Sequence, residues 1–97
     1  MPFVLKHDKT SQIFTCTLIN SYELAYYGTK FWDDEEEARA AYSDFLRSQG
    51  VLEIGDWQLM ELSDHDLKLC NVKLKNDPRL ILSFNEETQK MTVSISP

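Results

Sequence analysis

The hydrophobic pattern is clearest between residues 33 and 50, where it has the period of an α-helix. Apolar side chains recur there at spacings of three and four residues and form one stripe: Ala38, Ala41, Tyr42, Phe45 and Leu46. Asp33 followed by Glu36 is an acidic variant of a helix-start signal, and Gly50 suits the left-handed position that ends a helix. The pattern predicts a helix over residues 33–49 with one face buried against a sheet.

Most of the remaining chain alternates between apolar and polar positions, as β-strands do. We predict strands over residues 3–7, 13–19, 22–32, 57–62, 79–84 and 90–96. In the second of these, one face is wholly apolar (Phe14, Cys16 and Leu18) and should meet the helix, whereas the other is half polar and suits solvent (Ile13, Thr15, Thr17 and Ile19). The element order is β-β-β-α followed by further strands.

Residues 63–76 fit two patterns at once. Ser63 with Asp66 is a helix-start signal, and the positions of Leu67, Cys70 and Leu74 have helical spacing. Cys70, Val72 and Leu74 also alternate with polar residues, as in a strand. We favour a turn near residues 63–67 followed by a strand over 69–75. The predicted fold class is therefore α+β: a mostly antiparallel sheet, continued as a meander, with one main helix packed on one face.

Length and composition bound the class of protein. The 97 residues suffice for one compact α+β domain over residues 1–97. No stretch approaches the run of about 20 apolar residues that spans a membrane, and the N-terminus lacks the layout of a signal peptide. We therefore expect a cytoplasmic protein. No motif is specific enough to assign the chain to a known family.

The charge is acidic and unevenly distributed. The whole chain has a net charge of −6, with five Lys/Arg against 13 Asp/Glu in residues 1–67 and five against three in residues 68–97. An acidic chain of this kind is not expected to bind nucleic acid, because such binding rests on neutralising phosphates. The basic patch of Lys68, Lys73, Lys75 and Arg79 is interpreted as a solvated strand edge protected by lysine.

Catalytic and metal-binding motifs are absent from the pattern. Three glycines are too few for a phosphate-cradling loop, and Cys16 and Cys70 are interpreted as buried free thiols. The acidic run over residues 33–37 would fan around a helix, and the segment over residues 64–66 is interpreted as a solvated turn. We predict no catalytic residue, no metal site and no cofactor, and more readily a non-enzymatic protein than an enzyme.

Aromatic residues are dense just before the predicted helix. One strand cannot bury Tyr22, Tyr26, Tyr27, Phe31 and Trp32 against a single helix, so either both its faces are covered or some rings contact solvent. Exposed Tyr and Trp are typical binding hot spots. We predict a module for protein–protein interaction or regulation whose partner-binding residues are Tyr22, Tyr26, Tyr27, Trp32, Glu35 and Glu36.

A second hypothesis is a small-molecule site, catalytic or not, in a cleft between helix and sheet. It depends on the polar groups of Tyr22, Tyr42, His7 and His65. Free strand edges would also permit a dimer, but nothing in the pattern indicates one.

Overall fold

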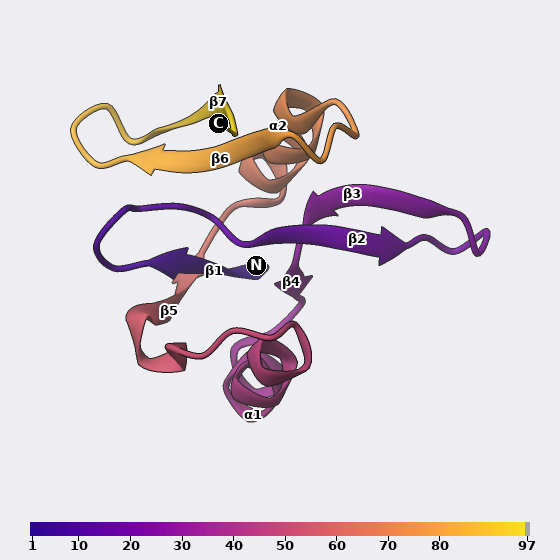
Figure 1. Cartoon of the computed structure of the whole chain (residues 1–97), viewed down its shortest axis with the longest axis vertical. Coiled ribbons are helices and arrows are strands. Elements are labelled where there is room, and N and C mark those ends of the chain that lie inside the picture. The colour runs from indigo at the N-terminus through magenta and orange to yellow at the C-terminus, as the bar shows by residue number, and fades with distance from the viewer. Residues whose placement is uncertain (97) are drawn as a thin grey trace.

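Strand β1 (Phe3–His7) lies at the centre of the molecule, with a helix on either side of it (Figure 1). The computed structural model describes residues 1–96. Val4 and Leu5 are both fully buried, and because successive strand residues point to opposite faces they enter different core clusters. The elements after β1 are β2 (Thr15–Ile19), β3 (Ala25–Thr29), β4 (Phe31–Trp32), α1 (Glu35–Ser48), the 3₁₀ turn η1 (Ile54–Asp56), β5 (Trp57–Glu61), α2 (Asp64–Leu74), β6 (Leu80–Asn85) and β7 (Lys90–Ile95).

All strand pairings are antiparallel. β1 pairs with β5 along one edge and with the short β4 along the other, while β2–β3 and β6–β7 form two hairpins. Single bridges join these parts: Lys6 pairs with Ile13, and Gln12 pairs with Ser83. The predicted α+β class with antiparallel pairing is confirmed, and the single sheet that was expected is divided into one three-stranded and two two-stranded sheets.

Helix α1 matches the predicted helix, with a small shift at its start. The N-cap is Asp34, one residue later than expected, and its side chain accepts a hydrogen bond from the Glu37 N–H at 2.8 Å. Gly50 has φ of 80°, the left-handed conformation that glycine adopts without strain. The apolar stripe packs toward β1, in one cluster with Leu5, Trp32 and Trp57.

Helix α2 overturns the predicted strand over residues 69–75. Ser63 caps it by accepting a hydrogen bond from the Asp66 N–H at 3.0 Å, and Leu67, Cys70 and Leu74 are buried at helical spacing. The strand interpretation required Val72 to share a buried face with Cys70, but Val72 is 61% exposed. Lys68 and Lys73 therefore lie on a helix and not at a strand edge.

The two helices bury chemically different cores. On the α1 side, aromatic rings meet edge to face: Phe14 with Phe45 at 5.4 Å, Phe14 with Trp57 at 5.2 Å, and Trp32 with Phe45 at 5.7 Å between centroids. The α2 side is built mainly from aliphatic and sulfur-containing side chains: Val4, Ile13, Leu62, Leu67, Cys70, Leu74, Leu82 and Met91. Both faces of β1 are thus covered.

The predicted strand over residues 22–32 is two separate strands. Tyr22 lies in a turn, β3 starts at Ala25, and β4 turns away to pair with β1. The division lets β2 and β3 leave the central strands as a hairpin that extends sideways from the body, as Figure 1 shows at the right.

Candidate protein-binding surface

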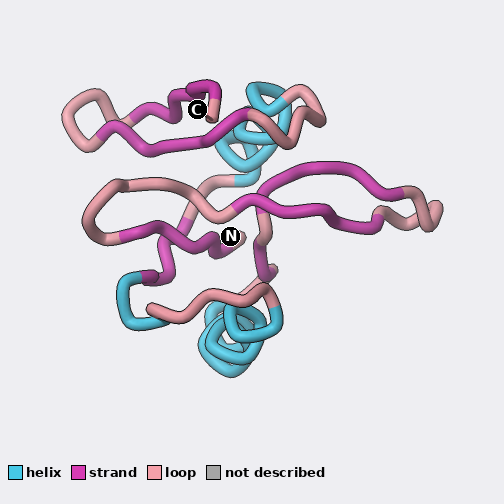
Figure 2. The backbone as a smooth tube through the Cα atoms, viewed as in Figure 1, coloured by secondary structure: helices cyan, strands magenta, loops and turns pink. Residues whose placement is uncertain are grey.

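The hairpin of β2, β3 and the connecting residues 20–24, here called the arm, has several exposed large apolar side chains at its end. Its two strands pair from Thr15 with Thr29 at the base to Ile19 with Ala25 near the end. In Figure 2 the connecting turn lies at the far right, beyond the other strands. At this end Ile19 is 64%, Tyr22 82% and Leu24 62% exposed. These three residues are called the tip.

The turn beneath the tip is tied by its own hydrogen bonds. The side-chain oxygen of Asn20 accepts from the Tyr22 N–H at 2.8 Å and from the Leu24 N–H at 3.0 Å. The Asn20 N–H in turn donates to the Leu24 carbonyl at 3.0 Å, and Glu23 has φ of 60°. This is the asparagine turn chemistry expected of a tight connection. The apolar side chains are therefore presented on an ordered backbone, which lowers the entropy lost on binding.

The two edges of the arm differ. On β3, the side-chain oxygens of Asn76 and Asn71 accept hydrogen bonds from the N–H groups of Tyr27 at 2.6 Å and Thr29 at 2.9 Å, so residues from α2 and the turn after it cover this edge. Because the N–H groups of Tyr27 and Thr29 point away from β2, these residues form non-hydrogen-bonded pairs with Thr17 and Thr15. The backbone groups of Thr15 and Thr17 therefore point away from β3, toward the outer edge of β2. Within residues 1–96, β2 pairs only with β3, so its outer edge is open.

A groove of about 430 Å³ lies between the arm and the start of α1. Its walls come from β2 and β3, from β4 and from the acidic helix start: Leu18, Ile19, Tyr26, Lys30, Phe31, Trp32, Asp33 and Glu37. The Tyr26 ring lies against Gly28, where an added Cβ would come within 2.8 Å of the ring. Lys30 is held over the rings of Trp32 and Phe45, 5.0 Å from each centroid. The groove thus combines aromatic walls with a carboxylate rim.

The six residues predicted to bind a partner fall into four places. Tyr22 is at the tip, and Tyr26 and Trp32 line the groove, although Trp32 is only 5% exposed. The Tyr27 hydroxyl is bonded to the Thr15 hydroxyl at 2.6 Å, and its ring packs against the α2-side core. Glu35 and Glu36 are exposed on α1 outside the groove, and Glu35 pairs with Arg39 at 2.7 Å.

The tip residues Ile19 and Leu24 were not among the predicted site residues. Their signal in the sequence is a polar turn, Asn20-Ser21, flanked closely on both sides by apolar residues. The groove carboxylates Asp33 and Glu37 were also missed, because a linear acidic run does not indicate which of its members face a neighbouring hairpin.

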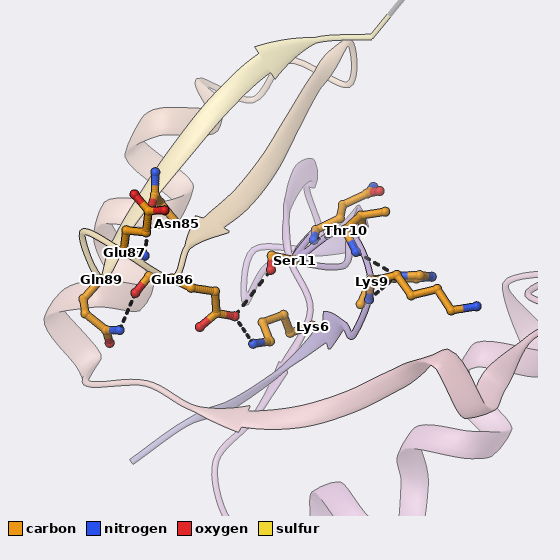
Figure 3. Close-up of polar contacts among 10 residues, drawn as sticks. Lys6, Lys9, Thr10, Ser11, Asn85, Glu86, Glu87 and Gln89 are labelled. Atoms are coloured by element: carbon orange, nitrogen blue, oxygen red, sulfur yellow. Dashed lines mark hydrogen bonds and ion pairs between the residues drawn. The ribbon is translucent and has the colours of Figure 1, made fainter.

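The tip of the other hairpin, residues 86–89, is polar and fastened to the body (Figure 3). Glu86 pairs with Lys6 of β1 and accepts a hydrogen bond from the Ser11 hydroxyl at 3.4 Å. The hydrogen bond from Lys6 holds the pKa of Glu86 below its usual range. The side chain of Asn85 accepts from the Glu87 N–H at 2.9 Å and the Thr88 N–H at 3.1 Å.

The polar groups of the small-molecule hypothesis lie on different elements. The Nδ1 of His7 accepts hydrogen bonds from the N–H groups of Lys9 and Thr10 at 3.2 and 3.3 Å, and the His7 ring meets Trp57 edge to face at 5.1 Å. Tyr42 packs in the α1-side core, Tyr22 is at the tip, and His65 is on α2. They do not form one site together.

Neither thiol is activated. Burial raises the pKa of Cys16, which is half-buried in β2. Burial, helped by the nearby charge of Asp66, raises the pKa of Cys70 to about 11. Both stay protonated at neutral pH, and a protonated thiol is a poor nucleophile and metal ligand. Among residues 1–96, no group of three His, Cys, Asp or Glu side chains is placed to hold a metal ion.

The chain matches no protein-family model, and it is not significantly similar to any characterised protein or solved structure with which it was compared. Within residues 1–96, neither helix has the length and apolar character needed to cross a membrane. The geometry described above is therefore the basis for the functional assignment.

Proposed function

We propose that this protein is a non-enzymatic protein–protein interaction module that holds its partner with the arm. The observation that carries the proposal is the tip: three large apolar side chains, each more than 60% exposed, on a turn whose backbone is hydrogen-bonded. Solvent-exposed turns usually carry small polar residues, because contact between apolar side chains and water is unfavourable. A tip of this composition is accounted for by a partner that covers it.

The chemistry of the surface indicates what kind of partner would fit it. Tyr22 is the kind of amphipathic ring that dominates interface energetics, and Ile19 and Leu24 flank it, so the partner should offer an apolar pocket. Carboxylates of Glu23 in the turn and of Asp33 and Glu37 at the groove are exposed, so the rim of that pocket should be basic. The open edge of β2 has no charge, proline or glycine and can accept an added strand from the same partner.

The two cysteines support a reducing compartment such as the cytoplasm. Cys16 and Cys70 are both free, and Cys70 is fully buried. Free buried thiols suit a compartment where disulfides are not formed.

The test is affinity capture of the full chain from cytosol, with variants chosen by exposure. Tyr22→Ser combined with Leu24→Ser removes two anchors of the tip. The matched control is Leu52→Ser, because Leu52 is 95% exposed but lies in the loop after α1. We expect a stoichiometric protein to be retained by the wild type and the control, and its retention to fall at least about tenfold with the tip variant.

Two outcomes of this capture experiment would contradict the proposal. One is equal capture by the tip variant and the Leu52→Ser control; the other is no stoichiometric protein with any of them.

Raising the salt concentration separates the contribution of the charged rim from that of the apolar tip. The Debye length falls from about 10 Å at 0.1 M salt to about 3 Å at 1 M, so charge pairs with a basic rim are screened, whereas the apolar contacts of the tip persist.

A further inference from the structure

A second concave site lies between α2 and the β6–β7 hairpin, which Figure 1 shows beside each other. Its volume is about 300 Å³. Its lining combines apolar residues (Leu62, Leu69, Phe84 and Met91) with polar and charged ones, among them Lys73 and Lys90. Such a mixture, an apolar wall with a few polar groups, is typical of small-molecule sites.

The apolar wall continues the α2-side core outward. Leu62 and Met91 belong to that core and are 6% and 8% exposed, and Phe84 packs against it. Leu69 stands further out on α2, 38% exposed, at the opening of the cavity. A ligand with an apolar body would therefore contact an existing core surface and cover Leu69 as well.

The charged side chains that line the cavity have a net positive charge, whereas the chain as a whole is acidic. Lys73, in the last turn of α2, and Lys90, the first residue of β7, approach from two different elements. Within residues 1–96 neither lysine forms an ion pair, and Asp66 is the one carboxylate that lines the cavity. In a protein of net charge −6, these two ammonium groups leave a local excess of positive charge beside an apolar wall.

We propose that this cavity binds a small amphipathic monocarboxylate. The carboxylate lies between Lys73 and Lys90, each of which donates a charge-assisted hydrogen bond. The apolar body packs on Leu69, Phe84 and Met91. The volume is at the lower end of the roughly 300–1,000 Å³ found for ligand sites, which favours an acid with a chain of about six carbon atoms or a single ring over a nucleotide or a long-chain lipid.

The test is isothermal titration of the full chain with three probes that share one apolar body: hexanoate, hexanol and hexylammonium. We expect hexanoate to bind at least about tenfold more tightly than hexanol, because the alcohol lacks the charge, and hexylammonium not to bind. Equal binding of hexanoate and hexanol would contradict the carboxylate assignment. No binding of any of the three would contradict the site itself.

Variants locate the site. Lys73→Met and Lys90→Met keep an apolar stem and remove the ammonium group, so each should weaken hexanoate binding by about tenfold. Lys68→Met is the matched control, since Lys68 is exposed on the same helix but does not line the cavity, and its affinity should equal that of the wild type. Hexanoate binding that survives both cavity variants unchanged would overturn the proposal. Because the tip residues do not line this cavity, the tip variant should bind hexanoate normally, and the two proposals can fail independently.

Discussion

The two hairpins of this protein have the same architecture, but the connection of one is polar and the end of the other is apolar. Each is an antiparallel pair of strands joined by a short connection. The connection of β6–β7 is polar, its backbone is capped by Asn85, and Glu86 fastens it to Lys6 on the central strand. The tip of the arm has a turn ordered just as well by Asn20, but it presents Ile19, Tyr22 and Leu24 to solvent.

Under the proposed function, the β6–β7 hairpin serves folding and the tip of the arm serves binding. The β6–β7 hairpin contributes Leu82 and Met91 to a core cluster, so these two residues are used within the chain, while Val93 and Ile95 further along β7 are 40% and 74% exposed. The apolar residues of the arm tip enter neither core cluster and do not contribute to the stability of the isolated domain in the same way. The contrast predicts that substitutions in the two hairpins will affect different properties.

The largest contrast in stability should come from one buried and one exposed aliphatic residue. Leu82 on β6 is fully buried, and Leu82→Ala should lower the free energy of unfolding by about 2–5 kcal/mol because it leaves a cavity. Ile19 is 64% exposed, and Ile19→Thr should change it by less than about 0.5 kcal/mol. Urea denaturation of both variants measures the difference. A large loss of stability in Ile19→Thr would show that the tip is a structural element of the fold, as Leu82 is.

The attachment of the arm to α2 can be tested at Asn71. Its side chain accepts the N–H of Thr29, a fully buried residue at the base of the arm. Asn71→Ala leaves that N–H without its acceptor and should lower the free energy of unfolding by about 1–3 kcal/mol. Val72→Ala, at an exposed position of the same helix, is the control and should cost much less. Equal effects of the two substitutions would mean that the arm does not depend on the asparagine.

A gain in stability is expected at the base of the arm. The Thr29 side chain is fully buried, and its hydroxyl has no hydrogen-bond partner within residues 1–96. Thr29→Val keeps the shape and the β-branching while it removes the unpaired hydroxyl, so the free energy of unfolding should rise by about 1 kcal/mol. Thr17→Val, on the exposed part of β2, should be close to neutral. Thermal denaturation would show a lower Tm for Thr29→Val if the hydroxyl were satisfied.

The smallest expected effect concerns the fastened tip of β6–β7. The folded-state pKa of Glu86 is lowered from 4.5 by the hydrogen bond from Lys6. A lowered pKa means that the ionised carboxylate stabilises the fold above pH 4.5 and that this contribution is lost as the pH falls through the folded-state value. Wild type should therefore be more stable than Glu86→Gln at neutral pH, with the difference closing in acid. A difference that is independent of pH would contradict the ion pair.

Local patterns predicted the α1 side of the molecule well and the α2 side less well. The stripe from Ala38 to Leu46 has one helical period and no competing alternation. On α2, Val72 completed a false strand pattern, and only packing against the sheet distinguishes the exposed Val72 from the buried Cys70. The face of β2 predicted to suit solvent is exposed at Thr17 and Ile19. Ile13 is fully buried, because its bridge to Lys6 of β1 places its side chain in the α2-side core.

The candidate site was only partly predictable for a similar reason. Aromatic density indicated Tyr22 and Tyr26, which the structure places at the tip and in the groove, whereas the ring of Tyr27 packs against the α2-side core. The groove and the α2 cavity both form between segments that are distant in the sequence, so their lining depends on tertiary contacts that no local pattern reveals.

The most direct test of the arm as a recognition element is site-specific photocrosslinking in cells. A benzophenone amino acid replaces Tyr22 at the tip of the arm and, as the matched control, Thr88 in the exposed connection of β6–β7. We expect one discrete crosslinked protein from position 22 and none from position 88. The same products from both positions, or none from position 22 in a folded protein, would contradict it.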